Sequence, residues 1–176
     1  MIKKKIKLYY KNIVSKTFEN IHGKVFLKKN TSAFLDISQV KDPFFKSYEN
    51  KKYNIYKVKK ARIFTDNNEN VAVIKNNILI PKLSFQQIKG RLHNAKYNSV
   101  IKKGTPSFIK KFTGTVLNLA QGGSGNNYFH FLFDVITRLK LCEEKYPLKK
   151  IDYFYIPGNF NWQKKYYKRL ELKIIN

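Results

Sequence analysis

The sequence has a single cysteine, few acidic residues and no long apolar run. Because Cys142 stands alone, the chain can form neither an intramolecular disulfide nor a metal site built from cysteines. No stretch approaches the roughly 18 to 20 apolar residues of a membrane-spanning helix. The basic start, MIKKKIKLYYKNIV, lacks the apolar core of a signal peptide. We therefore expect a cytoplasmic protein that is soluble or at most peripheral at the inner face of the membrane.

Acidic residues are scarce, since 11 Asp and Glu stand against 36 Lys and Arg and leave a formal net charge of +25. Such an excess suggests an anionic partner: nucleic acid, a membrane surface or a phosphorylated substrate. The abundant residues are those with AT-rich codons, Arg is scarce beside Lys, and the basic residues are spread from Lys3 to Lys173. This distribution favours codon bias at the surface and argues against nucleic acid as a partner. A basic module that binds nucleic acid or another polyanion stays open as the alternative.

The length of 176 residues and the 43% hydrophobic content suit one domain, or part of a larger one. Residues 1–23 form a basic N-terminal segment. In residues 24–120 the apolar residues come in short runs bounded by Asn, Asp, Gly or Pro, which predicts a β-rich region. From residue 121 the order changes to helix, strand and helix, which predicts the incomplete start of a parallel α/β lobe in residues 121–176.

Within the β-rich region the clearest element is a hairpin in VAVIKNNILIPK, because Asn76 and Asn77 tolerate the positive φ angles of a two-residue turn. Ser84 and Gly90 suit the N-cap and the stop of a short helix over residues 84–89. Strands are predicted at residues 25–27, 33–37, 53–58, 71–74 and 115–119.

The glycine cluster at residues 122–125 precedes a predicted helix over residues 127–145, whose apolar residues recur at spacings of three and four. The cluster matches neither a phosphate-binding loop nor a dinucleotide fingerprint, so we interpret it as a flexible connection. Residues 151–156 predict the next strand and residues 161–172 a second helix. At Ile174 and Ile175 we expect the following strand of the α/β unit to be missing.

A polar stripe crosses the helix over residues 127–145, because Asn127, His130, Asp134 and Arg138 lie three, four and four apart. In a structural interpretation, Asp134 and Arg138 form an ion pair, His130 bonds a backbone carbonyl and Asn127 caps the helix. In a functional interpretation, the stripe lines a cleft and Asp134 orients His130 as a general base. His22 and His93 have no partner at a metal-ligand spacing, so we assign no metal.

The run NNYFHFLFDVITRL resembles the signature of the family 61 glycosyltransferases, in which an Asn-Tyr-x-His-[apolar pair]-x-Asp-x-x-x-Arg-Leu helix follows a glycine-containing loop. The matching residues, in order, are Asn127, Tyr128, His130, Asp134, Arg138 and Leu139. The stretch KKARIFTDNNENVAVIKNNILIPK before the motif, and the IDYFYIPG strand and the helix with Gln163 after it, are also similar. The resemblance covers residues 50–176.

The resemblance implies transfer of a sugar, with inversion, from a nucleotide-sugar donor to a hydroxyl of a glycan acceptor. It implies a role in surface or capsular polysaccharide biosynthesis, without an obligatory metal or another cofactor. It implies a two-lobed GT-B fold whose first, Rossmann-like lobe faces the acceptor. His130 would be the catalytic base and Asp134 would orient it, or Asp134 would itself be the base. Asn127, Tyr128 and Arg138 would position the substrate.

Family members are longer than this chain and place a donor-binding second lobe after the region matched here. We therefore expect an N-terminal portion that is inactive alone, and we favour a truncated product. A separate chain that carries the second lobe is a further alternative, as is a catalytically silent protein that binds carbohydrate.

Overall fold

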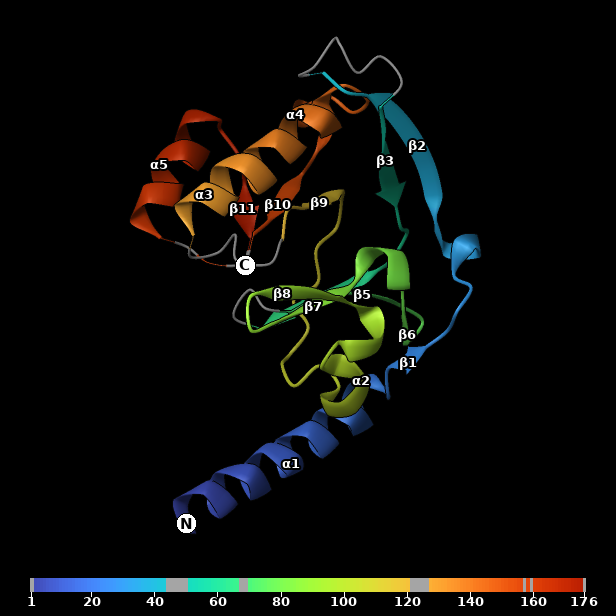
Figure 1. Ribbon diagram of the computed structural model, residues 1–176, viewed down its shortest axis with the longest axis vertical. Coiled ribbons are helices and arrows are strands. Elements are labelled where there is room, and N and C mark those ends of the chain that lie inside the picture. Colours follow the sequence, from blue (N-terminus) through green and yellow to red (C-terminus); the bar gives the residue numbers. More distant parts are fainter. Residues whose placement is uncertain are drawn as a thin grey trace. The chain divides into compact units, whose positions relative to one another are not determined.

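The computed structural model describes residues 2–43, 51–66, 70–120, 127–156, 158 and 160–175. The protein is mixed α/β, and its elements divide between two compact units (Figure 1). Unit 1 comprises residues 1–31, 60–64 and 70–111, and unit 2 comprises residues 32–59, 65–69 and 112–176. Each unit is built from separated stretches of the chain, whereas the three segments predicted from the sequence follow one another along it.

Unit 1 begins with a helix that the sequence analysis did not predict. Helix α1 spans Ile2–His22, 21 residues with no acidic residue in the first turn. It ends where the Gly23 amide bonds the Glu19 carbonyl at 2.8 Å and Gly23 takes a φ of +79°. Glycine reaches this left-handed conformation without steric cost, which is why it commonly follows the last helical residue. Residues 2–22 of the basic N-terminal segment therefore form a helix.

The sheet of unit 1 has the strand order β1-β6-β5-β7-β8, and β4 also pairs with β5. Strands β1 and β6 are parallel, and the pairs β5–β6, β5–β7 and β7–β8 are antiparallel. The strands are β1 (Phe26–Leu27), β4 (Arg62–Asp66), β5 (Asn70–Lys75), β6 (Ile78–Leu79), β7 (Phe85–Ile88) and β8 (Arg91–Asn94). Short helices η2 (Pro81–Leu83), η3 (Ala95–Tyr97) and α2 (Val100–Lys103) complete the unit.

The predicted hairpin is confirmed as β5–β6, with Asn76 and Asn77 in the turn at φ 49° and 58°. The helix predicted over residues 84–89 is wrong, because this segment is strand β7. Ser84 is not an N-cap: it follows η2 as its C-terminal cap, and its hydroxyl receives a hydrogen bond from the Val73 amide at 3.0 Å. Gly90 stops no helix either, since Lys89 and Gly90, at φ 50° and 75°, form the tight turn between β7 and β8.

The core of unit 1 surrounds the central strand β5, which is buried at five of its six residues. Apolar side chains from distant stretches meet there, namely Val25, Ala72, Ile74, Leu79, Ala95 and Val100. Asn98 is a buried polar residue within the unit and is 2% exposed. Its side-chain amide donates to Asn70 Oδ1, to the Val71 carbonyl and to the Phe85 carbonyl.

Unit 2 contains an antiparallel pair of strands, β2 (Asp36–Lys41) and β3 (Lys52–Lys57), in which Asp36 pairs with Lys57 and Lys41 with Lys52. The strand predicted over residues 33–37 is wrong in its first half, because η1 (Ser32–Phe34) is a 3-10 turn and β2 begins only at Asp36. The strand predicted over residues 53–58 is confirmed as β3.

The larger part of unit 2 alternates strands and helices. Strands β9 (Val116–Asn118), β10 (Tyr153–Tyr155) and β11 (Ile174–Ile175) form a parallel sheet in the order β11-β10-β9. One helical stretch made of α3 (Tyr128–His130), η4 (Phe131–Ile136) and α4 (Thr137–Glu143), followed by the short helix η5 (Leu148–Lys150), lies between β9 and β10, and α5 (Asn161–Arg169) lies between β10 and β11. The parallel α/β arrangement is thus confirmed, but the expected absence of the following strand is wrong, because Ile174 and Ile175 pair with β10 as β11.

The two helical connections pack together over this sheet. The buried core consists of Leu119, Phe131, Val135, Leu139, Phe154, Ile156 and Tyr167. Phe131 lies 5.1 Å from Trp162 and 5.6 Å from Tyr167 between ring centroids, which brings the first helical stretch against α5. The glycine cluster at residues 122–125 lies outside the described residues.

In the part of the chain that the structure describes, no helix combines the length and the apolar character needed to cross a membrane.

Candidate functional site

The predicted helix over residues 127–145 is confirmed as one helical stretch made of α3 (Tyr128–His130), η4 (Phe131–Ile136) and α4 (Thr137–Glu143). Asn127 caps it, because its Oδ1 accepts a hydrogen bond from the His130 amide at 3.2 Å. The middle segment η4 is π-helical, a conformation that occurs often at functional sites. The polar stripe therefore begins at a capped N-terminus and continues through an irregular turn.

His130 and Asp134 form a direct pair, with 2.8 Å between Nδ1 and Oδ2. Both side chains remain accessible, at 40% and 32% exposure. An ionised carboxylate can only accept a hydrogen bond, so Nδ1 donates its hydrogen, and in the neutral imidazole Nε2 then has the lone pair. The structural interpretation predicted a bond from His130 to a backbone carbonyl, whereas its Nδ1 bonds the Asp134 carboxylate. This contact matches the part of the functional interpretation in which Asp134 orients the imidazole, whereas the cap at Asn127 is the one that the structural interpretation predicted. The cleft along the stripe stays a prediction.

Arg138 lies one turn beyond Asp134. Burial lowers the pKa of Arg138 from its usual value, and the negative charge of Asp134 opposes this effect. The carboxylate of Asp134 therefore interacts with two basic groups, the imidazole at 2.8 Å and the guanidinium through its charge. Arginine remains protonated at neutral pH, so the stripe combines a fixed positive charge with the imidazole.

Tyr128 is held by helix α5. Its hydroxyl oxygen lies 2.5 Å from that of Tyr166, and its ring centroid lies 5.3 Å from that of Trp162. The hydrogen bond to Tyr166, together with desolvation, raises the pKa of Tyr128. These contacts give Tyr128 a packing role between two helices, and its substrate-binding role stays a prediction.

Two exposed aromatic rings beside the pair were missed by the sequence reasoning. Phe129 and Phe133 are 61% and 58% exposed, with 4.5 Å between their ring centroids. Phe129 also lies 5.9 Å from the His130 ring. Their spacing of four residues, off the buried face of the helix, was the available signal. Exposed rings next to a polar pair offer an apolar platform for the carbon face of a ligand.

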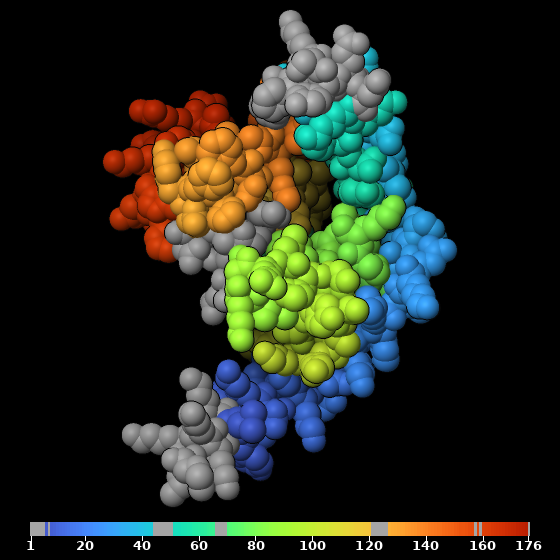
Figure 2. Space-filling view, viewed as in Figure 1, coloured from blue at the N-terminus to red at the C-terminus, as the bar shows by residue number. Residues whose placement is uncertain are grey.

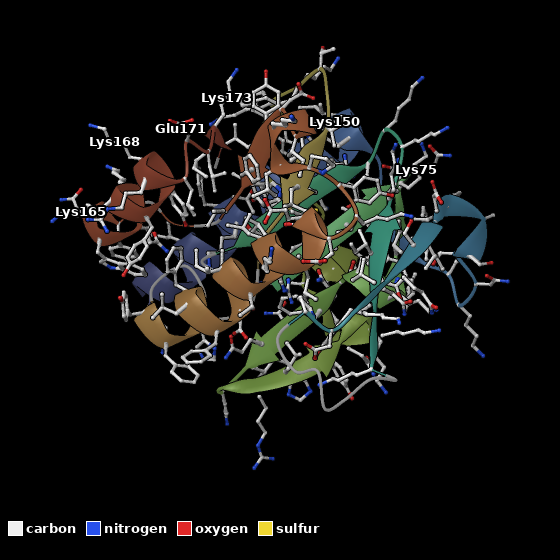
Figure 3. The ribbon with its side chains drawn as sticks, turned by 90° about the horizontal axis from the view of Figure 1, so that it is seen from above. Lys75, Lys150, Lys165, Lys168, Glu171 and Lys173 are labelled. Atoms are coloured by element: carbon white, nitrogen blue, oxygen red, sulfur yellow. The ribbon has the colours of Figure 1, made fainter. Side chains whose placement is uncertain are left out.

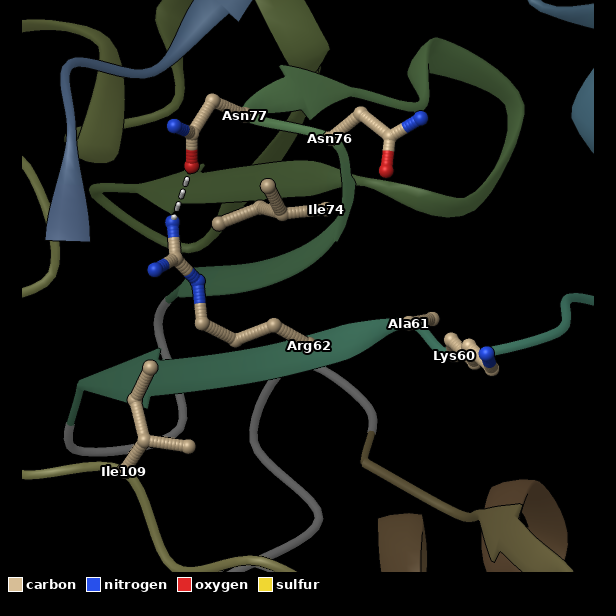
Figure 4. A pocket seen from close by; sticks show the side chains of 7 residues that line it. All are labelled: Lys60, Ala61, Arg62, Ile74, Asn76, Asn77 and Ile109. Atoms are coloured by element: carbon tan, nitrogen blue, oxygen red, sulfur yellow. Dashed lines mark hydrogen bonds between the residues drawn. The ribbon is translucent and has the colours of Figure 1, made fainter.

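A second candidate lies in unit 1, where a shallow pocket of about 230 Å³ is lined by Lys60, Ala61, Arg62, Ile74, Asn76, Asn77 and Ile109 (Figure 4). Arg62 donates to Asn77 Oδ1 at 3.3 Å, and its buried Nε has no hydrogen-bond partner among the described residues. Burial lowers the pKa of Arg62. Among the described residues, the lining contains cations and amides but no acidic, thiol or hydroxyl side chain, so these residues offer binding groups without a general base.

The basic residues of α5 form a third candidate surface. Lys164, Lys165, Lys168 and Arg169 are all exposed, and Figure 3 shows Lys165 and Lys168 pointing away from the ribbon. The polyanion hypothesis predicts exposed aromatics within a positive face. The aromatic residues of α5 instead pack against the core of unit 2, where Tyr167 is 4% exposed. This helix has the ordinary distribution of an amphipathic surface helix.

The other two histidines lie far from the pair in the sequence and make separate contacts. His22 Nε2 lies 3.0 Å from the Ser107 carbonyl oxygen, and His93 packs against the Tyr97 ring. Within the described ranges, no three His, Cys, Asp or Glu residues are grouped as metal ligands. The pair of His130 and Asp134 is thus the arrangement with the clearest acid-base chemistry.

Comparison of this chain with protein-family models, curated proteins and solved structures finds no match.

Proposed function

We propose that this chain belongs to an inverting glycosyltransferase of the family 61 type, in which His130 removes the proton from an acceptor hydroxyl. The observation that carries the proposal is the 2.8 Å contact between His130 Nδ1 and Asp134 Oδ2. A carboxylate at Nδ1 selects the tautomer with a free Nε2 and stabilises the imidazolium that proton transfer creates. Asp134 is therefore the positioning residue, and His130 is the base.

In the proposed reaction, Nε2 of His130 accepts the hydroxyl proton of a glycan acceptor. The acceptor oxygen forms a bond with the anomeric carbon of a nucleotide sugar. The bond from that carbon to the diphosphate breaks, and its electron pair leaves with the nucleoside diphosphate. Attack opposite the leaving group inverts the anomeric configuration. Surface or capsular polysaccharide as the product is supported by the sequence resemblance alone.

The scaffold supports this proposal at the level of the fold. The helix that carries His130 follows β9, and open parallel sheets place their binding sites beyond the carboxyl ends of the strands. The order β11-β10-β9 with helical connections corresponds to the first half of a doubly wound sheet. We therefore propose a Rossmann-like first lobe of the GT-B type for unit 2.

The neighbours of the pair suit an acceptor sugar. Phe129 and Phe133 supply the apolar platform beside the imidazole, and Arg138 supplies a cation along the same stripe. Asn127 contributes by capping the helix, so its predicted role in binding substrate is secondary to its role in placing His130. We assign no residue to the nucleotide-sugar donor.

The test is a transfer assay with the purified chain together with a polypeptide that supplies the donor-binding second lobe, a panel of UDP- and GDP-hexoses and a set of oligosaccharide acceptors. We expect a product with inverted anomeric configuration by NMR. His130→Ala should lower the rate by about 10² to 10⁴, the usual contribution of a general base. His93→Ala is the matched control, because His93 packs against Tyr97 in unit 1, and it should retain the wild-type rate. A retained configuration, or equal rates in His130→Ala and wild type, would refute the assignment.

A second measurement does not require turnover. Nitrogen-15 NMR of the imidazole should show Nδ1 protonated in the wild type, and Asp134→Ala should shift His130 to the Nε2-protonated tautomer. Oligosaccharide without donor should perturb the His130 ring signals of the wild type. Perturbation without transfer would favour the catalytically silent carbohydrate-binding alternative. The absence of both transfer and perturbation would reject the glycosyltransferase proposal and the carbohydrate-binding alternative alike.

A further inference from the structure

Helix α1 packs through one face and leaves the opposite face uncovered. The Phe18 ring lies 5.1 Å from the Phe108 ring, and His22 Nε2 lies 3.0 Å from the Ser107 carbonyl oxygen. Phe18 and His22 are four residues apart, so they share a face of the helix. Figure 1 shows only the C-terminal part of α1 beside the rest of unit 1.

The other face carries a run of exposed apolar side chains, Ile6, Tyr9, Tyr10 and Ile13, which we call the α1 stripe. Their spacing is i, i+3, i+4 and i+7, which makes one continuous band on a helix. They are 62%, 70%, 68% and 47% exposed, and Figure 2 shows the described part of α1, in blue, at the molecular surface. A contiguous apolar band on an otherwise basic helix marks an interaction surface.

The charge of α1 indicates the kind of surface that it meets. Its sequence contains lysine at positions 3, 4, 5, 7, 11 and 16 and a single acidic residue, Glu19. Lys11 and Lys16 are exposed. Because so many like charges would repel a second copy packed along the same helix, self-association is disfavoured. A partner surface with negative charges over an apolar layer complements both the lysines and the α1 stripe.

We propose that α1 is an interfacial anchor, which lies on a bilayer containing anionic phospholipid and inserts the α1 stripe at the boundary between headgroups and acyl chains. Basic amphipathic helices bind membranes in this way, with lysine stems extending to the headgroups. Tyr9 and Tyr10 can stack on nucleic-acid bases, but Ile6 and Ile13 offer neither stacking nor hydrogen bonds to them, and α1 contains no arginine. The bilayer therefore fits better than nucleic acid. The inference depends only on α1 and is independent of glycosyl transfer.

The test is flotation of the full chain with two kinds of vesicle. One contains phosphatidylcholine alone, and the other contains phosphatidylcholine and phosphatidylglycerol at a 3:1 ratio, so that about one lipid in four is anionic. Wild type should float with the anionic vesicles and bind the neutral ones at least about tenfold more weakly. The double variant Ile6→Ser/Ile13→Ser should bind anionic vesicles about tenfold more weakly than wild type. Leu8→Ser is the matched control, since Leu8 is 61% exposed on the same helix but off the α1 stripe.

The outcomes separate the proposal from its rivals. Loss of binding in the stripe variant, with Leu8→Ser within about twofold of wild type, supports the anchor. No flotation of wild type, or equal flotation of the stripe variant, overturns it. Equally tight binding of wild type and stripe variant to a single-stranded oligonucleotide, without flotation, would indicate a polyanion site instead. A dimer in sedimentation that the stripe substitutions abolish, again without flotation, would indicate a second copy as the partner.

Discussion

Asn98 offers a sharp test of how unit 1 is held together. Its Nδ2 donates to Asn70 Oδ1 at 2.8 Å, to the Val71 carbonyl at 3.0 Å and to the Phe85 carbonyl at 2.9 Å. Its Oδ1 accepts from the Val100 amide at 3.1 Å. One buried amide thus connects strands β5 and β7 to the start of α2.

Replacement of Asn98 by alanine removes the contacts of two Nδ2 hydrogens, which three acceptors share, and of one Oδ1 acceptor, and it leaves buried partners unpaired. At about 1 kcal/mol net for each of these three groups and about 1 kcal/mol more for a buried partner left unpaired, Asn98→Ala should cost about 4 kcal/mol. This is a large share of the roughly 5 to 15 kcal/mol that stabilises a typical domain. Asn98→Asp keeps the side-chain volume but turns an oxygen towards three acceptor oxygens, so we expect it to be at least as destabilising. That variant separates the loss of hydrogen bonds from the loss of packing.

Two probes distinguish the units in a urea titration. Trp162 is the only tryptophan and belongs to unit 2, so its fluorescence should be little affected by Asn98→Ala. Hydrogen exchange of amides in β5 and β7 reports on unit 1. With an m-value of about 2 kcal/mol/M, the loss of 4 kcal/mol moves the unfolding midpoint of unit 1 by about 2 M.

Asn94→Ala is the matched control for this experiment. Asn94 is exposed and accepts one hydrogen bond, from the Lys96 amide at 3.3 Å, so its removal should cost less than about 1 kcal/mol. Wild-type stability of unit 1 in Asn98→Asp would refute the reasoning, because the three donor contacts could not then contribute as assigned.

Three further predictions concern single residues. Tyr167→Phe should stabilise unit 2 by about 1 kcal/mol, because the buried Tyr167 hydroxyl has no hydrogen-bond partner in the described part of the chain. Burial also raises the pKa of Tyr167 in the folded state, so ionisation of this tyrosine favours the unfolded state: it leaves the free energy of unfolding unchanged below about pH 10 and lowers it as the pH rises further. Urea titrations at pH 8 and above pH 10, followed by Trp162 fluorescence, should show that Tyr167→Phe loses less stability at alkaline pH than the wild type. The Cys142 thiol, buried and with a raised pKa, should react with a disulfide reagent about 10²-fold faster in urea than in the native protein, and equal rates would show that the thiol is accessible. Gly90→Ala should lower the free energy of unfolding of unit 1 by about 1 kcal/mol in a urea titration, since no atom crowds the new Cβ but the φ of +75° is unfavourable for alanine; an unchanged midpoint would contradict this.

The sequence predicted those elements whose formation depends on residues close together in the chain. The turn at Asn76 and Asn77 follows from the tolerance of asparagine for positive φ, and the helix from Tyr128 to Glu143 follows from a long apolar period. The segment Ser84–Lys89 was mistaken for a helix because serine before a run of Gln, Ile and Lys is also a good helix start. Pairing with β5 and β8 overrode that preference, since strand formation depends on partners outside the segment.

The first helix shows a different cause of failure. In α1 the lysines interrupt the apolar period, so the α1 stripe at Ile6, Tyr9, Tyr10 and Ile13 is diluted in the sequence and becomes evident once the helix is formed. Whether the α1 stripe is exposed depends on which face of α1 packs against unit 1. That face is determined by contacts with Ser107 and Phe108, about 85 residues further along the chain.

The amino-acid sequence by itself determined the excess of positive charge, the hairpin turn and the spacing that allows His130 to reach Asp134, because each depends on composition or on residues within one or two turns. The tertiary structure decided that Ile174 and Ile175 form a third parallel strand, that Phe129 and Phe133 stay exposed beside the imidazole, and that the α1 stripe is uncovered. Strand partners and burial are set by residues far apart in the chain, and no local pattern contains them.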